Sequence, residues 1–165
     1  MVVYCSESER QRCLVAANLV AAQLLAKPVA VFASYGSFVT GKTHAIISDF
    51  IRQWIKAGYL DPSEISLIEY GGGLFSTTEV DVLAVELGRV RKTYGFYQAC
   101  KKAHRILVFA TGEAQAELVA ESFQYGHISS NPLAILGNHE KVCLIADQAA
   151  VSKLSREYGI WYESC

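Results

Sequence analysis

The chain has 165 residues, of which 52% are hydrophobic and 19% are charged. This composition predicts a single folded domain over residues 1–165 and argues against disorder. The formal net charge of −1 leaves no basic surplus to neutralise phosphate backbones, so we expect no nucleic-acid partner.

The N-terminal stretch MVVYCSESERQR lacks the basic segment and the apolar run of a secretory signal. No apolar run approaches the roughly 18 residues of a membrane span. The five cysteines are irregularly spaced and form no CxxC pair, which favours free thiols in a reducing compartment. We therefore expect a cytoplasmic protein with no membrane partner, no metal and no other cofactor.

Helical and strand-like segments alternate in the first half of the chain. Residues 6–27 predict a helix with Ser6 or Ser8 as its cap and Lys27-Pro28 as its stop. An amphipathic helix is predicted over 43–57 and is ended by Gly58. The continuous apolar run at 29–33 and the segment at 65–69 predict strands.

The second half repeats this alternation. Helices are predicted over 93–102 and 113–123, and a third runs from Asp147 to Leu154. The predicted strands are 80–87, 105–110 and 142–146, with a further short one at 133–136.

Apolar strands that alternate with helices predict a three-layer α/β fold, in which a mostly parallel sheet is covered by helices on both faces. Ligands of such folds bind at the carboxyl ends of the strands. Glycine-rich segments follow three of the predicted strands, and we expect them to meet at this edge: Gly36 with Gly41, Gly71–Gly73, and Gly112.

Residues 36–43, GSFVTGKT, match the GxxxxGK[ST] pattern between a predicted strand and a predicted helix. In a nucleotide-binding P-loop, backbone N–H groups cradle phosphates, Lys42 would reach the terminal phosphate, and Thr43 would ligate Mg²⁺. Such a site also needs an acidic residue at a strand end. Asp147 is the one plausible choice, although it also suits a helix N-cap. In a P-loop fold the loop-bearing strand is central.

A second interpretation rests on segments that follow one another in a characteristic order. FASYGSFVTG at 32–41 holds a strand and a glycine loop, and VDVLAVELGRVRK at 80–92 holds another. AHRILVFATG at 103–112 and the stretch 126–150 complete the series. Together they resemble the glucosamine-6-phosphate deaminase/isomerase family, with two large internal deletions. No single motif is specific, but the order and spacing extend over most of the chain.

The resemblance implies a phosphate loop like the family's GSTPxG, which Gly36, Ser37 and Gly41 match and which Phe38 and Val39 do not. It also implies a small phosphorylated sugar as the ligand. Glu69, at a strand end, could act as a general base or could cap a loop. The residues expected to bind ligand or phosphate are Gly36, Ser37, Thr40, Gly41, Lys42, Thr43, Gly88, Lys92 and Gly112.

The family's catalytic residues are largely replaced. Ile68 stands at the position of the proton-shuttling base, Lys92 at that of the catalytic histidine, and Gln115 at that of a phosphate-binding lysine. Loss of a general acid or base typically costs about 10²–10⁴-fold in rate. We therefore expect ordinary deaminase activity to be absent or very weak.

Three hypotheses follow. The chain is a sugar-phosphate-binding protein of carbohydrate metabolism, which could retain an isomerase-type reaction with altered chemistry. Alternatively, it is a P-loop nucleotide-binding enzyme, or a non-catalytic subunit that pairs with another chain. The short length and an exposed sheet edge favour a homo-oligomer.

Overall fold

The computed structural model describes residues 1–27, 29–35, 41–70, 79–90, 94–125 and 132–164. These residues form one seven-stranded sheet in the order β3-β2-β4-β5-β6-β1-β7, and every neighbouring pair is parallel. The strands are β1 (Val2–Ser6), β2 (Ala30–Tyr35), β3 (Ile65–Tyr70), β4 (Val80–Glu86), β5 (Ala103–Ala110), β6 (Val142–Ala146) and β7 (Ile160–Ser164).

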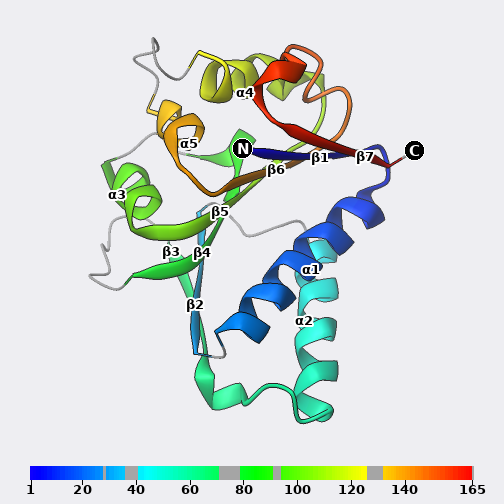
Figure 1. The fold of residues 1–165 in the computed structure, drawn as a ribbon, viewed down its shortest axis with the longest axis vertical. Helices are drawn as coiled ribbons and strands as arrows, with labels where there is room; N and C mark the ends of the chain where they lie inside the picture. Colours follow the sequence, from blue (N-terminus) through cyan, green and yellow to red (C-terminus); the bar gives the residue numbers. More distant parts are fainter. Residues whose placement is uncertain (28, 36–40, 71–78, 91–93, 126–131, 165) are drawn as a thin grey trace.

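Helices cover both faces of the sheet, with α1 and α2 on one face and α3, α4 and α5 on the other (Figure 1). The helices are α1 (Glu9–Ala26), α2 (Gly41–Lys56), α3 (Tyr94–Lys102), α4 (Ala116–Phe123) and α5 (Ala134–Asn138). Short 3₁₀ turns are η1 (Pro62–Glu64), η2 (Leu87–Arg89), η3 (Glu113–Gln115) and η4 (Arg156–Tyr158). The expected three-layer α/β fold is confirmed.

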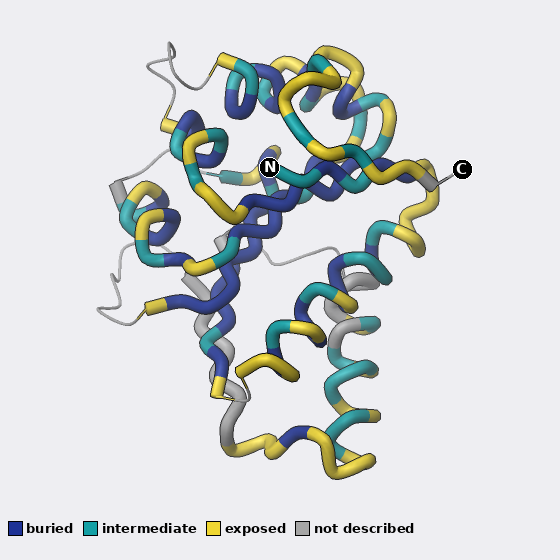
Figure 2. Tube along the Cα trace, viewed as in Figure 1, coloured by how far each residue is buried: buried dark blue, intermediate teal, exposed yellow. Residues whose placement is uncertain are grey.

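Two apolar cores lie between the sheet and its two helical layers. On the α1–α2 face, Phe32, Val82 and Leu107 of the sheet pack with Leu24 of α1. On the other face, Phe96 of α3 belongs to a cluster that also contains residues of α4 and α5. The central strands are buried, whereas the outer sides of the helices are exposed (Figure 2).

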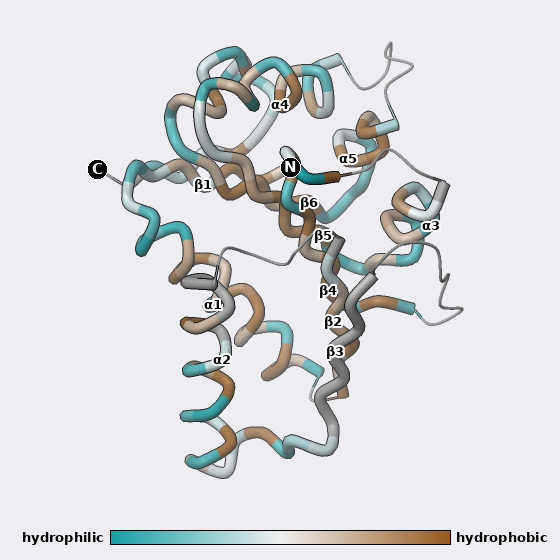
Figure 3. The backbone as a smooth tube through the Cα atoms, turned by 180° about the vertical axis from the view of Figure 1, so that it is seen from behind, coloured by the Kyte–Doolittle hydropathy of each residue, from teal (hydrophilic) through white to brown (hydrophobic). Residues whose placement is uncertain are grey.

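The middle of the sheet is apolar on both faces because helices remove both faces from water. Residues 80–85 of β4 are all buried, including the charged Asp81. The hydropathy of the chain follows the same arrangement, since the central strands are hydrophobic and the outer side of α2 is hydrophilic (Figure 3).

The predicted ends of the first two helices are confirmed. Ser8 is the N-cap of α1, and its side chain accepts a hydrogen bond from the N–H of Gln11 at 3.4 Å. Lys27 is the C-cap of the same helix. Gly58 follows α2 with φ +77°, a left-handed conformation that glycine adopts without a steric penalty.

Four segments differ from the sequence-based expectation. Strands β1 and β7 were not predicted, and they pair with each other at one side of the sheet. Residues 133–136 were predicted as a strand, but α5 occupies most of this segment. Residues 147–154 form turns rather than a helix, and Asp147 caps the first turn by accepting the N–H of Ala150 at 2.8 Å.

Among the helices that the structure describes, none combines the length and apolar character needed to cross a membrane.

Asp81 ties β4 to the start of β2. Its carboxylate accepts hydrogen bonds from Lys27 Nζ and from the N–H of Val31, each at 2.8 Å.

We expect Asp81→Ala to lower the free energy of unfolding by about 1–3 kcal/mol, because it leaves the Val31 N–H without its partner. Lys27→Met should cost less, since the Lys27 side chain is 55% exposed and its charge is solvated. Urea denaturation of both variants checks this order, and equal losses would contradict it.

Candidate functional site

The carboxyl ends of all seven strands lie at one edge, because every neighbouring pair is parallel. Within this edge β2 and β4 are neighbours, but the chain leaves them toward opposite faces. After β2 it reaches α2 on one face, and after β4 it reaches α3 on the other. Such a divergence is the topological switch point at which open α/β sheets bind ligands. We therefore take the ends of β2 and β4 as the candidate site.

The sequence-predicted loop lies at this point, although much of it is outside the described residues. Gly36, Ser37, Thr40 and Lys92 all fall outside them. Gly41, Lys42 and Thr43 are the first three residues of α2. Glu69 lies near the end of β3, opposite Ser34 of β2. The fold thus places the end of β3 beside the end of β2, and α2 begins at Gly41, after residues 36–40.

Gly88 and Gln115 are brought together by the fold. Gly88 lies in η2, directly after β4, and Gln115 lies in η3, after the neighbouring strand β5. A Cβ atom on Gly88 would lie 2.6 Å from the side-chain nitrogen Nε2 of Gln115, so a larger residue there would require the Gln115 side chain to move. The side-chain oxygen Oε1 of Gln115 is buried, and it has no hydrogen-bond partner among the described residues.

Glu86 ends β4 at the same place. Its Oε1 forms an ion pair with Arg89 Nε at 3.1 Å, and its side chain is 20% exposed. Its second oxygen, Oε2, is buried, and no described residue donates a hydrogen bond to it. A buried carboxylate oxygen without a donor costs free energy, so this oxygen is prepared to accept a hydrogen bond from a ligand or from water.

Gly112 follows β5 with φ +83°, a left-handed conformation that favours glycine. Its N–H lies 3.0 Å from each carboxylate oxygen of Asp147, which follows β6. The amide is therefore bonded within the protein, and ligand binding by Gly112 stays a prediction. Asp147 in turn holds the ends of β5 and β6 together.

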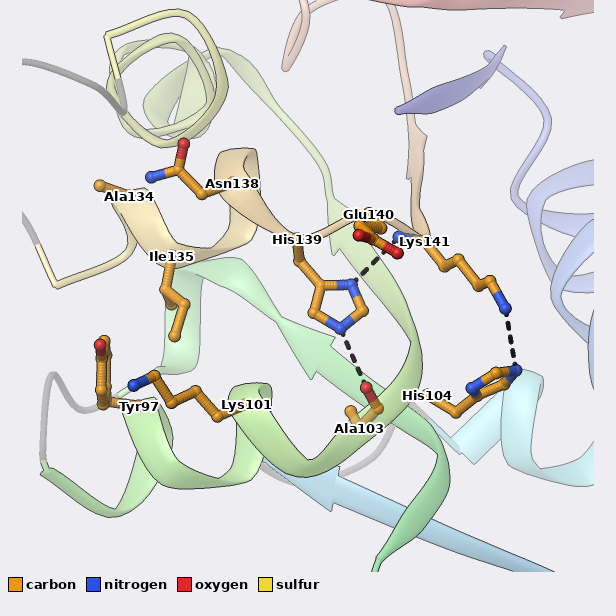
Figure 4. Close-up of a pocket in the computed structure, with 10 residues that line it drawn as sticks. All are labelled: Tyr97, Lys101, Ala103, His104, Ala134, Ile135, Asn138, His139, Glu140 and Lys141. Atoms are coloured by element: carbon orange, nitrogen blue, oxygen red, sulfur yellow. Dashed lines mark hydrogen bonds between the residues drawn. The ribbon is translucent and has the colours of Figure 1, made fainter.

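A separate pocket of about 710 Å³ lies at the opposite edge of the sheet, beside the start of β5 (Figure 4). His139 lines this pocket, and both of its ring nitrogens contact backbone atoms. Nδ1 accepts the N–H of Lys141 at 3.2 Å, and Nε2 lies 2.9 Å from the Ala103 carbonyl. This pair of bonds assigns the proton to Nε2 of a neutral ring. His139 therefore shapes the turn before β6.

The pocket also contains two lysines that lie apart. Lys101 Nζ lies over the ring of Tyr97, 4.8 Å from its centroid. Lys141 Nζ instead contacts His104 Nε2 at 3.0 Å. Because this pocket is at the amino ends of the strands, it is distinct from the switch-point site. Nowhere in the described part of the chain do three or more histidine, cysteine or acidic side chains gather as they would around a metal ion.

Sequence reasoning singled out the β2 loop, but it treated Glu86 and Gln115 only as departures from a family pattern. The structure makes them the polar side chains of the described site. A signal was present in the sequence, because Glu86 is the one acidic residue that ends an otherwise apolar run, VLAVE. The sequence could not show that η2 and η3 are neighbours, because their proximity depends on the pairing of β4 with β5.

Comparison with known proteins identifies the class of fold. No protein-family model and no curated protein sequence matches the chain. Among solved structures, the chain is similar to a monomeric glucosamine-6-phosphate deaminase described as a missing link of the NagB superfamily. The TM-score is 0.62 at 14% sequence identity, and the match covers 93% of this chain and 100% of the deaminase. The chain therefore has the fold of a NagB-superfamily deaminase, as the sequence resemblance predicted.

Proposed function

We propose that this chain belongs to the NagB superfamily by descent and binds a small phosphorylated sugar at the switch point, without ordinary deaminase activity. The observation that carries the proposal is the pair of buried acceptors, Glu86 Oε2 and Gln115 Oε1, at the ends of β4 and β5, where β4 adjoins β2, the strand that precedes the predicted phosphate loop. The hydroxyl and amino groups of a sugar are hydrogen-bond donors. Such donors are what these two acceptor oxygens lack among the described residues.

The phosphate of such a ligand would bind at the other side of the site. Gly41 begins α2, and the N-terminus of a helix offers free N–H groups and a positive dipole end to an anion. Lys42 adds a positive charge in the first turn. Glu86 is unsuited to a phosphate, because two anions would repel each other. The charges therefore orient the ligand, with its phosphate toward α2 and its hydroxyl or amino groups toward η2.

The loss of deaminase activity follows from the residues at the catalytic positions that the resemblance implies. Isoleucine at 68 cannot remove a proton, and lysine at 92 cannot act as a histidine would near neutral pH. Glu69 lies near the end of β3 and Glu86 at the end of β4, the two strands that flank β2. Proton transfer by one of these carboxylates, in an altered, isomerase-type reaction, is the catalysis we consider for this chain.

The binding proposal is tested by calorimetric titration of glucosamine 6-phosphate and other hexose and pentose phosphates. We expect Glu86→Gln to weaken binding by about tenfold, since a hydrogen bond to a charged group contributes about 1.5–3 kcal/mol. Lys42→Ala should weaken it by a similar factor. Glu79→Gln is the matched control, because this exposed glutamate lies at the opposite end of β4.

Folded protein that binds none of these sugar phosphates would refute the proposal. Equal effects of Glu86→Gln and Glu79→Gln would refute the role of Glu86 while leaving the ligand class intact. An ammonia-release assay with glucosamine 6-phosphate should give no turnover above background. Release within about a hundredfold of an ordinary deaminase would contradict the loss of catalysis.

Nucleotide binding by the GxxxxGKT segment is the second candidate function. Two features count against it. β2 is second from the edge of the sheet rather than central, and Asp147 is already bonded to Gly112 and Ala150. Asp147 also follows β6, three strand spacings or roughly 14 Å from β2.

One feature favours it, since Glu86 ends the strand adjacent to β2 and could hold Mg²⁺. Titration with ATP separates the two functions. Binding that requires Mg²⁺ and is lost in Glu86→Gln would favour a nucleotide site, whereas Mg²⁺-independent binding of sugar phosphates favours the first proposal.

We also propose pairing with a second copy of the chain. β3 and β7 are the edge strands of the sheet, and Ile160 and Tyr162 of β7 are exposed. Light scattering that returns a monomer at micromolar concentration would remove this part of the proposal.

A further inference from the structure

Arg105 is a positively charged residue in the sheet with no counter-charge among the described residues. It lies in β5, and its side-chain Nε is buried without a hydrogen-bond partner in this part of the chain. No carboxylate of a described residue is within ion-pair distance of its guanidinium. Because a guanidinium carries five N–H donors and no acceptor, a partly buried one without a partner is unfavourable.

A second cation lies beside it. Ile106 pairs with Val142 across β5 and β6, which sets Arg105 next to Lys141. The Ile106 N–H donates to the Lys141 carbonyl at 2.9 Å, so the two strands are already in register at this position. Lys141 directly precedes β6, and its Nζ contacts the neutral partner His104 Nε2 at 3.0 Å, so no anionic group among the described residues pairs with either cation. Like charges at adjacent positions of paired segments are destabilising.

These residues line a cavity of about 210 Å³ at the amino edge of the sheet, on the α1–α2 face. Tyr4, Leu19 and Cys143 also line it, and the Arg105 charge acts on the Cys143 thiol. Drug-sized ligands occupy cavities of about 300–1,000 Å³, so this one suits a smaller molecule. Its position separates it from the switch point, which is at the carboxyl edge.

The other polar groups of the cavity do not supply the missing negative charge. Burial raises the pKa of the Cys143 thiol to about 12, and the nearby Arg105 charge only partly opposes this rise. Burial also raises the pKa of Tyr4, so its hydroxyl stays neutral at physiological pH. Glu140 lines the cavity, but it is exposed and makes no ion pair with Arg105 or Lys141 among the described residues.

We propose that this cavity is a second ligand site, which binds a small tetrahedral oxyanion, inorganic phosphate or the phosphate group of a small monoester, through Arg105 and Lys141. The planar guanidinium can donate two parallel hydrogen bonds to such an anion, and the Tyr4 hydroxyl can donate a third. The bound anion would neutralise both cations and join β5, β6 and β1 at their amino ends. Occupancy of this site is independent of the sugar-phosphate site.

The test uses the full chain with Lys42→Ala, which weakens phosphate binding at the start of α2. Inorganic phosphate and glucosamine 6-phosphate are titrated separately by calorimetry, with sulfate as a competitor. We expect Arg105→Gln to weaken phosphate binding by about tenfold or more and Lys141→Gln to weaken it less. Arg10→Gln removes the same charge from an exposed position on α1 and should change the affinity less than twofold.

The two titrations separate the sources of the anion. Arg105-dependent binding of inorganic phosphate supports a free phosphate site, and Arg105-dependent binding of glucosamine 6-phosphate alone supports a monoester site. The absence of binding by either compound at millimolar concentration would overturn the proposal. Equal affinities of the Arg105→Gln protein and its parent would also overturn it.

A stability measurement distinguishes a binding role from a structural one. In phosphate-free buffer, Arg105→Gln should not lower the melting temperature, because it removes an unpaired buried donor. Phosphate should raise the melting temperature of the parent and not that of the variant. If Arg105 instead supports the fold, its replacement lowers the melting temperature equally in both buffers, which would refute the proposal. Arg105→Leu repeats the test should the glutamine variant fail to fold.

Discussion

Replacing Phe96 with alanine is expected to lower the free energy of unfolding by about 3–5 kcal/mol. The Phe96 side chain is fully buried and fixes α3 against the apolar face of β4 and β5. Its removal leaves a cavity that the surrounding strands cannot fill, because their backbones are fixed by parallel pairing on both sides. Many domains have a total stability of only about 5–15 kcal/mol, so this variant should be partly unfolded at 37 °C.

Tyr97→Ala is the matched control for this change. Tyr97 is the next residue of the same helix, but it is 38% exposed, and its ring contacts Lys101 at the surface. We expect its replacement to cost less than about 1 kcal/mol. Urea denaturation measures both variants, and a shift in midpoint without a change in slope would show that stability alone changed. Similar losses for the two variants would contradict the buried role of Phe96.

The Phe96 variant should also affect the candidate site. The chain passes from β4 through η2 to α3, so α3 holds the far end of the segment that contains Gly88. Loosening this helix should weaken sugar-phosphate binding at temperatures where the protein is still folded. Unchanged affinity in the folded fraction would show that η2 keeps its place without α3.

Gly137→Ala is expected to lower the free energy of unfolding by about 1–3 kcal/mol, through a close contact between two helices. A Cβ atom at this position of α5 would lie 2.5 Å from the backbone oxygen of Ser122 and 3.2 Å from the Cα of Phe123 in α4. Both are backbone atoms of buried residues of α4, so they cannot move away as a flexible side chain could. α4 and α5 would have to separate.

The direction of the change in the free energy of unfolding distinguishes this close contact from an ordinary helical position. Glycine to alanine at an unstrained helical position usually stabilises a protein by about 0.4–1 kcal/mol. Stabilisation by Gly137→Ala would therefore contradict the close approach of α4 and α5. Asn138→Ala, at the exposed neighbouring position, serves as the control and should change stability little. Thermal and urea unfolding of both variants provide the comparison.

Much of the fold could be predicted from local patterns. The apolar runs of β2, β5 and β6 are strands, and the amphipathic pattern at 43–57 agrees with α2 to within two residues. The predicted C-terminal ends of the first two helices, at Lys27 and Gly58, were also correct. Such ends can be predicted because they depend on local backbone preferences. The α/β alternation of these elements then indicated a parallel sheet with helices on both faces.

Local sequence patterns did not predict the elements whose conformation depends on contacts with distant parts of the chain. β1 has five residues, and its stability depends on β6 and β7, which come from the far end of the chain. The apolar run Leu133-Ala134-Ile135-Leu136 suits either a strand or a buried helix by composition. Packing of α5 on α4, through the contact at Gly137, decides in favour of the helix.

For the candidate site, the sequence by itself determined the residue types: a glycine loop before a helix, and, at the positions that the family resemblance implies, isoleucine and lysine for two catalytic groups and glutamine for a phosphate-binding lysine. These are chemical identities, which do not depend on folding. Only the tertiary structure decided that Gln115 lies against Gly88, that a buried Glu86 oxygen has no donor among the described residues, and that Arg105 lies beside Lys141. Each of these depends on the register of strands that are distant in the sequence, and register is set by packing of the whole sheet.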